Sequence, residues 1–267
     1  NKNLSSIANQ TYPFYRIIYV NDCSTDNTHR EVNKYTKELR LSNKMTLINN
    51  KERLGQAYGR NVAANNCDDD EICCLLDGDD WLVNDNNILE KLNELYIKNN
   101  LLMSYGQFYY YTGDEEKMSL SGHNYYTADE IKNNNYRNKW VTQHLRILEA
   151  SLLKSMPDEY LKLNGKYITC CTDLLEMLWC LERSNGRHMN NGFPTYIYNK
   201  MASLTYSNSY YNSIKSEYRL SVIKYIENYN MVSFIVTIHN VETNIKKTLM
   251  SIINQTYKNI EIIVVDN

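Results

Sequence analysis

Three carboxylates gather within four residues, at Asp77-Gly78-Asp79-Asp80. They follow the apolar residues 71–76, which predict a buried strand that ends directly before them. Like charges repel one another, so folding alone gives little reason to gather them, whereas a hard divalent cation such as Mg²⁺ or Mn²⁺ binds carboxylate oxygens. Because ligands bind at the carboxyl ends of strands in α/β sheets, the motif predicts a metal held against a phosphate-bearing substrate. An acidic turn exposed to water is the alternative interpretation.

Alternating strands and helices are expected to position this motif. The hydrophobic periodicity predicts strands at 14–21, 45–48, 71–76 and 101–111, and helices at 26–40, 55–66 and 84–98. This order indicates an α/β fold with a mostly parallel sheet flanked by helices. After residue 112 the alternation weakens, and we expect a less regular half with a polar loop at 113–124, helices at 140–156 and 172–183, and a short strand at 195–198.

The composition is that of an ordinary globular chain of 267 residues, with 43% hydrophobic and 22% charged residues. The net charge of -2 gives no electrostatic case for a nucleic-acid partner. No apolar run approaches the roughly 18 residues that span a bilayer, so no transmembrane segment is expected. The seven cysteines include no CxxC motif, which argues against zinc and favours reduced thiols in the cytoplasm, or on a protein peripheral to a membrane.

The two ends of the chain repeat one another. Residues 1–22 align with residues 246–267 without a gap, with 11 identities in 22 positions. The offset of 245 residues is far longer than a solenoid repeat and indicates duplication of a whole domain. The second copy has an apolar strand before its helix, and the first copy begins inside the helix. We therefore expect a fragment of a tandem protein, with a first domain at 1–205 that lacks its first strand, a connecting helix or linker at 206–231, and the strand–helix–strand start of a second copy at 232–267.

Four motifs follow one another in the chain: residues 20–26, Gly55 followed by Arg60-Asn61, the carboxylates of residues 77–80, and the segment from 233 to 267. In this order they resemble the motifs of the family 2 glycosyltransferases of the GT-A fold. The resemblance covers residues 1 to about 205 and again 232–267. It implies a GT-A fold, a nucleotide-sugar donor (a UDP-sugar) bound with Mn²⁺ or Mg²⁺, and inverting transfer to a hydroxyl of a glycan, protein or lipid-linked acceptor.

The resemblance assigns roles on the donor side. Asp22 matches the position that contacts the nucleobase, although an Asx-turn that closes the strand explains it locally as well. Arg60 fits a contact with the nucleotide or diphosphate, because guanidinium donors suit phosphate geometry, and a helix-surface arginine is the alternative. Asp77 and Asp79 form the DxD pair, with Asp79 as the metal ligand and Asp77 on the metal or the ribose. Asp80 is expected to orient its neighbours or the donor sugar.

On the acceptor side the resemblance implies a general base. Asp173 matches the family's acidic catalytic motif and would take the proton of the attacking hydroxyl. The family usually has an acidic residue directly before it, and this chain has Thr172. Local sequence also fits an acid in the first turn of a helix. His144 and Arg146 would lie near the diphosphate, and Trp140 would stack on a sugar.

Other classes of function stay open. A degenerate, non-catalytic module that binds a sugar or nucleotide fits the incomplete ends, and a DxD phosphatase of the haloacid-dehalogenase type also places two aspartates after an apolar strand. The phosphatase explains neither Arg60 nor Asp173. We also expect the strand at residues 232–240, of the same chain or of a neighbouring chain, to fill the vacant strand position beside residues 14–21.

Overall fold

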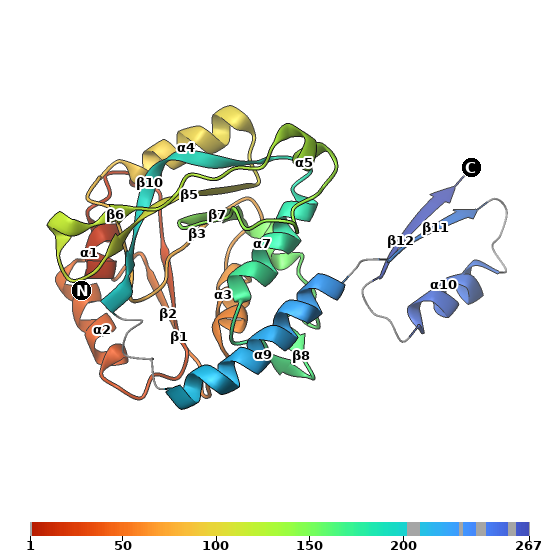
Figure 1. Cartoon of the computed structure of the whole chain (residues 1–267), viewed down its shortest axis with the longest axis horizontal. Helices are drawn as coiled ribbons and strands as arrows, with labels where there is room; N and C mark the ends of the chain where they lie inside the picture. The colour runs from red at the N-terminus through yellow and green to blue at the C-terminus, as the bar shows by residue number, and fades with distance from the viewer. Residues whose placement is uncertain (1, 202–208, 230–231, 239–243, 256–259, 267) are drawn as a thin grey trace. The chain divides into compact units, whose positions relative to one another are not determined.

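The computed structural model describes residues 2–201, 209–229, 232–238, 244–255 and 260–266 (Figure 1). It divides into two compact units, residues 1–222 and residues 223–267. Helix α9 (Ser209–Asn228) crosses that division. Among the helices of the described ranges, none is both long and apolar enough to cross a membrane.

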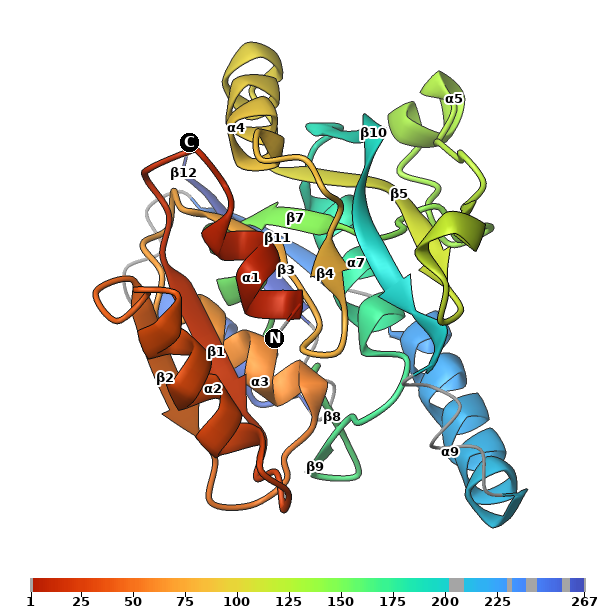
Figure 2. The same cartoon turned by 90° about the vertical axis from the view of Figure 1, so that its left-hand side faces the viewer.

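The first unit opens with a strand–helix–strand arrangement. β1 (Ile17–Asn21) and β2 (Met45–Asn49) pair in parallel. α2 (Thr28–Glu38) provides the crossover that parallel strands require. α1 (Lys2–Ala8) precedes β1, and Figure 2 shows both helices beside the two strands. The small apolar core between these elements consists of Leu4, Ile17, Val32 and Leu41.

A second, six-stranded sheet carries most of the unit. Its strand order is β3-β7-β5-β10-β4, with β6 paired to β5. The bounds are β3 Ile72–Leu75, β4 Trp81–Leu82, β5 Met103–Tyr111, β6 Ser119–Leu120, β7 Arg146–Glu149 and β10 His188–Asn199. Only β5 and β10 pair in parallel in this sheet; the other neighbours pair in an antiparallel manner.

The α/β class is confirmed, but the expectation of a mostly parallel sheet is wrong for this larger sheet. Parallel pairing needs a crossover that returns the chain in the same direction, as α2 does for β1 and β2. β7 is reached instead through the irregular residues 112–145, and it enters between β3 and β5 in the opposite direction to both. The short elements of this part of the chain are η1 (Glu115–Lys117), α5 (Ala128–Lys132), α6 (Ala150–Lys154), β8 (Lys162–Leu163) and β9 (Lys166–Tyr167).

The predicted helix at residues 140–156 is also wrong. Residues 146–149 form the strand β7, and only the five-residue helix α6 follows. The reason is that β7 is buried on both faces of the sheet, so its apolar residues run consecutively and carry no alternation that separates a strand from a helix. The other long helices lie close to their predicted positions: α3 Gln56–Ala64, α4 Ile88–Asn99 and α7 Thr172–Arg183.

The described residues do not show the expected strand exchange. β11 (Val232–Ile238) pairs in parallel with β12 (Ile260–Asp266), the strand of its own copy, and α10 (Ile245–Ile253) lies between them in the chain. In the first unit, β1 pairs with β2, and β3 pairs with β7. In the described part of the chain, β1 and β3 therefore belong to separate sheets.

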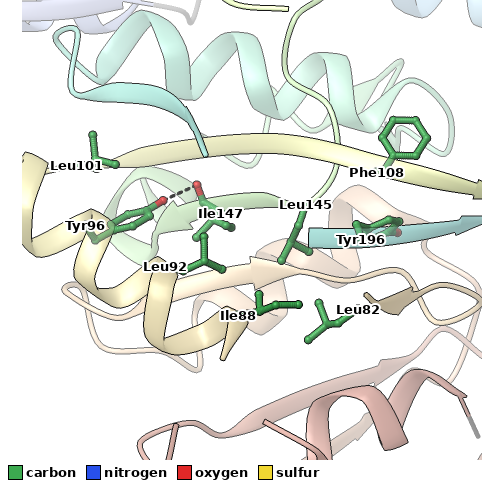
Figure 3. Close-up of a cluster of buried hydrophobic side chains, with 9 residues drawn as sticks. All are labelled: Leu82, Ile88, Leu92, Tyr96, Leu101, Phe108, Leu145, Ile147 and Tyr196. Carbon is green, nitrogen blue, oxygen red and sulfur yellow. Dashed lines mark hydrogen bonds between the residues drawn. The ribbon is translucent and has the colours of Figure 1, made fainter. Parts of the chain in front are cut away.

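One apolar core lies between α4 and the larger sheet, on the side away from α7 (Figure 1). In Figure 3 the Tyr96 hydroxyl of α4 donates to the main-chain carbonyl of Ile147 at 2.8 Å. This contact fixes α4 to the centre of β7. The buried cluster consists of Leu82, Ile88, Leu92, Tyr96, Leu101, Phe108, Leu145, Ile147 and Tyr196.

Tyr96→Phe is expected to lower the free energy of unfolding by about 1 kcal/mol, because it removes this buried hydrogen bond without opening a large cavity. Urea denaturation followed by circular dichroism measures the change. Tyr125→Phe is the control, because the Tyr125 side chain is 62% exposed. We expect the control to change stability by less than about 0.5 kcal/mol. Equal losses in the two variants would contradict the contribution of the Tyr96 hydrogen bond.

Candidate functional site

The three carboxylates after β3 lie in three different environments. Asp80 is buried, with 2% of its surface exposed. Its two oxygens accept hydrogen bonds from the Tyr196 hydroxyl and from the main-chain N–H of Asn199, the latter at 2.7 Å. Burial raises the pKa of Asp80 to about 7. Asp80 thus fastens the acidic loop to β10, which agrees with an orienting role, and leaves its carboxylate no free oxygen for a ligand.

Asp79 is the exposed carboxylate of the loop. Its own main-chain N–H donates to the carboxylate, and its main-chain carbonyl accepts from Asn199 Nδ2 at 3.1 Å. Partial burial, with a smaller contribution from the nearby charge of Asp77, raises the pKa of Asp79. A cation beside Asp79 would relieve that repulsion, so this carboxylate is suited to bind a metal.

Asp77 lies between the loop and the helices. Its Oδ1 accepts from Gln56 Nε2 at 2.7 Å and from Arg60 Nη2 at 3.0 Å, both from α3. Burial would raise the pKa of Asp77, but the charges of Arg60, His144 and Arg146 and the hydrogen bond from Arg60 together hold the pKa below its usual value. Asp77 is therefore ionised, and no described donor occupies its Oδ2.

Arg60 is a buried cation between two carboxylates. Its side chain is 10% exposed, and its second amino group, Nη1, donates to Glu176 Oε2 at 2.6 Å. Glu176 lies on α7 and is fully buried, which raises its pKa to about 7. Glu176 Oε1 has no hydrogen-bond partner among the described residues. Arg60 is thus neither a surface arginine nor a free phosphate ligand, because protein carboxylates occupy both ends of its guanidinium.

Asp173 is placed by α7 and by Arg146 of β7. Arg146 Nη2 lies 3.1 Å from Asp173 Oδ2, and Arg146 Nε donates to the carbonyl of Thr142 at 3.2 Å. Arg146 is almost fully buried, whereas the Asp173 side chain is 39% exposed. The Arg146 guanidinium also lies 5.6 Å from the ring centre of Trp140. The structure therefore brings the predicted base together with Arg146 and leaves the base open to solvent on one side.

His144 lies in an aromatic stack and feels the charges of Arg146, Asp77, Arg60 and Asp173. Its ring lies 4.4 Å from that of Tyr196 with an angle of 18° between the planes. Burial, followed by the charge of Arg146, lowers the pKa of His144 to about 3. Its Nδ1 has no partner within the described part of the chain. A neutral, stacked imidazole is a poor ligand for diphosphate.

Asp22 shapes the loop that leads into α3. Its carboxylate accepts from Asn50 Nδ2 at 2.8 Å and from the main-chain N–H groups of Leu54 and Gly55 at 2.9 and 2.8 Å. Burial would raise the pKa of Asp22, and these three hydrogen bonds together lower it. Gly55 has a φ of 88°, and a Cβ there would lie 2.7 Å from Thr169 Cγ2. Asp22 and Gly55 together set where α3 begins.

Three residues of the site were missed in the sequence: Gln56, Thr172 and Glu176. Gln56 and Arg60 are four residues apart on α3, as Thr172 and Glu176 are on α7, so each pair occupies one helix face. The four-residue spacing can be seen in the sequence, but no local sequence pattern indicates that these two helix faces meet. Thr172 Oγ1 donates to Gln56 Oε1 at 2.7 Å, which joins them.

The carboxylates fit a divalent cation only in part. Asp79 and the free oxygen of Asp77 are hard oxygen donors of the kind that Mg²⁺ and Mn²⁺ prefer. Within the described residues, however, no group of three or more His, Cys, Asp or Glu side chains could hold a metal ion. A cation here would take its remaining ligands from water and from a bound phosphate group, which is the usual arrangement for Mg²⁺.

A cavity of about 370 Å³ opens beside the acidic loop. It is lined by residues of α1, β1 and α2 together with Gly78, and none of the predicted site residues is among its lining. The cavity lies next to the loop that carries Asp79, and Arg60, Arg146 and Glu176 are not among its lining residues.

Comparisons with known proteins agree with this geometry. The sequence profile described as Glycosyl transferase family 2 matches residues 1–156 and 233–267, more than half of the chain. The fold is similar to that of S. aureus TarS 1–349, with a TM-score of 0.54 and 18% identity over 74% of this chain and 56% of that one. For S. aureus TarS 1–349 in complex with UDP the values are 0.53 and 20%, over 74% and 55%. This chain thus spans little more than half of either TarS chain. No curated protein matches the sequence.

Arg60→Met is expected to lower the free energy of unfolding by about 3–5 kcal/mol, because it leaves the fully buried Glu176 and the partly buried Asp77 without their cation. Chemical denaturation measures the loss, and the exposed Arg30→Met is the matched control. Adding Glu176→Met to Arg60→Met should recover part of the stability, since it removes one of the two unpaired charges. A double variant no more stable than Arg60→Met would contradict the charge pairing.

The lowered pKa of His144 predicts a pH dependence. The unfolded chain binds a proton on this imidazole below its ordinary value of 6.5, and the folded chain binds it only near 3. Stability contributed by neutral His144 is therefore lost as the pH falls from 6.5 towards 3, by up to about 1.4 kcal/mol per pH unit. His144→Phe keeps an aromatic ring against Tyr196 and should flatten the stability curve between pH 6 and 4. If stability fell with pH equally in His144→Phe and in the original chain, the contribution of His144 would be contradicted.

Proposed function

Since the chain belongs to glycosyl transferase family 2, we propose that it transfers a sugar, with inversion, from a nucleotide-sugar donor to an acceptor hydroxyl, with Asp173 as general base. The fold is of the GT-A type, as in the TarS structures. Because a fold does not by itself determine an activity, the roles of individual residues rest on the site.

The single observation that carries the proposal is the link from Asp77 through Arg60 to α7. Arg60 contacts Asp77 at 3.0 Å and Glu176 at 2.6 Å. Glu176 lies one helical turn after Asp173. The carboxylates suited to a metal and the solvent-open carboxylate suited to a base are therefore held in one connected site. An isolated acidic turn would have no such connection.

In the proposed step the acceptor oxygen forms a bond to the anomeric carbon as the bond from that carbon to the diphosphate breaks. Asp173 takes the proton of the acceptor hydroxyl, and the electron pair of the breaking bond leaves with the diphosphate. Arg146 orients the Asp173 carboxylate through their 3.1 Å contact. A divalent cation bound by Asp79 and Asp77 would offset the negative charge of the leaving diphosphate. Attack opposite the leaving group accounts for inversion.

The donor is proposed to be a UDP-sugar, since S. aureus TarS 1–349 is known in complex with UDP. The acceptor is proposed to be a hydroxyl of a glycan, a protein or a lipid-linked molecule. A cytoplasmic location belongs to the same proposal, because the described cysteines form no disulfide, which suits a reducing compartment. The phosphatase alternative is set aside, since the chain belongs to a different family.

UDP with Mn²⁺ should raise the melting temperature of the chain, because a ligand that binds only the folded state stabilises it. EDTA and, separately, Asp79→Asn should each remove most of that shift. The exposed Asp70→Asn, in the acidic turn before β3, is the control and should keep the shift. An unchanged shift in EDTA would contradict metal dependence.

Asp173→Asn should lower the rate of sugar transfer at least about 100-fold, because general base catalysis contributes on this order. It should leave the UDP-induced melting shift in place, since Asp173 is not proposed to contact the nucleotide. Product analysis with a panel of UDP-sugars and acceptors measures transfer. Nucleotide binding without transfer to any acceptor, in the original chain, would favour the non-catalytic binding module.

A further inference from the structure

Two hydrogen-bonded links join α3 to α7, and both begin at the same atom, Asp77 Oδ1. The first runs through Arg60, which contacts Asp77 at 3.0 Å and Glu176 at 2.6 Å. The second runs through Gln56, whose Nε2 lies 2.7 Å from Asp77 Oδ1 and whose Oε1 accepts from Thr172 Oγ1 at 2.7 Å. Asp77 is thus attached to α7 twice.

The two links lie side by side along the helices. Gln56 and Arg60 are one turn apart on α3, and Thr172 and Glu176 are one turn apart on α7. We call these four residues the ladder, with one rung from Gln56 to Thr172 and one from Arg60 to Glu176. Asp173 lies between the two rungs in the sequence of α7. A single rung lets a helix pivot about it, and two rungs fix both its distance and its rotation.

The ladder is costly to bury, and packing alone does not require it. Glu176 is 0% exposed and Thr172 is 2% exposed. Glu176 Oε1 is without a partner among the described residues, although a buried carboxylate oxygen without a hydrogen bond opposes folding. Buried ion pairs are often no more stabilising than apolar residues of similar size. A buried network that contributes little stability is better explained by the geometry that it fixes.

We propose that Thr172 and Glu176 are positioning residues, which hold α7, and with it Asp173, at a fixed place relative to Asp77 by way of Gln56 and Arg60. The ladder itself is independent of the activity, but its purpose rests on the proposed function, in which Asp77 helps to bind the metal and Asp173 is the base. The Thr172 hydroxyl donates a hydrogen bond to Gln56 Oε1. An ionised acidic side chain at this position would have no hydrogen to donate to that oxygen.

The test uses variants that remove each rung singly and a double variant that removes both rungs. Thr172→Val removes the first rung, Glu176→Met removes the second, and the double variant removes both. Thr172→Ser keeps the hydroxyl and Glu176→Gln keeps an oxygen that accepts from Arg60, so these are the conservative controls. Glu182→Gln is a control on the same helix, since Glu182 is paired with Arg137 outside the ladder. Hydrogen–deuterium exchange of the peptide that spans residues 171–177 reports on the first turn of α7 with no need for activity.

With two parallel rungs, loss of either should be tolerated better than loss of both. We expect exchange in residues 171–177 to rise about 3-fold or less in each single variant and at least about 10-fold in the double variant. The transfer kcat should fall about 100-fold in the double variant with the donor KM within about 2-fold, because misplacing one catalytic group affects the chemical step. The three controls should resemble the original chain in both measurements.

Several results would overturn the proposal. One is unchanged exchange of residues 171–177 in the double variant, and another is exchange that rises equally throughout the chain, which would indicate general destabilisation. Loss of kcat in Thr172→Ser as large as in Thr172→Val would also contradict it. If the original chain shows no transfer with any acceptor, the proposed function fails, and the exchange measurements still decide whether the ladder holds α7.

Discussion

A guanidinium that is nine-tenths buried must have its charge matched by buried anions, and Arg60 has Asp77 and Glu176. These anions belong to the loop after β3 and to α7, which are far apart in the sequence. The charge of Arg60 therefore determines that the acidic loop and α7 approach the same side of α3. The placement of Asp22 matters for the same reason, since it fixes the loop from which α3 begins.

β7 connects this charged site to the apolar core. Neighbouring side chains of a strand point to opposite faces, so Ile147 packs in the cluster below α4 while Arg146 reaches Asp173 on α7. One strand thus serves both as core and as support for the proposed base. A helix over these residues, which the apolar pattern predicted, would not place adjacent residues on opposite faces of a layer.

The three carboxylates of the acidic loop differ by environment rather than by chemistry. Each oxygen of Asp80 accepts from one donor, Tyr196 or Asn199, the charges around Asp77 hold it ionised, and Asp79 is exposed. This division suits the proposed donor site, because only some of the oxygens of one short sequence motif remain for a cation and a phosphate. It also explains why the motif alone is ambiguous, since a structural aspartate and a metal-binding aspartate look alike in sequence.

The sequence by itself determined the family, the α/β class and the strand that ends at Asp77, because ordered motifs and apolar periodicity are local properties of the chain. It also predicted Asp79 as a metal ligand and Asp173 as a general base, and the structure leaves both carboxylates exposed to solvent. Only the tertiary structure decided that Arg60 is paired with Asp77 and Glu176, that His144 is a partly buried ring with a lowered pKa, and that β7 is a strand between antiparallel neighbours. The physical reason is that burial and charge pairing depend on which surfaces meet in space. Gln56, Thr172 and Glu176 have no distinctive local signal, and they acquire their roles only where α3 and α7 face one another.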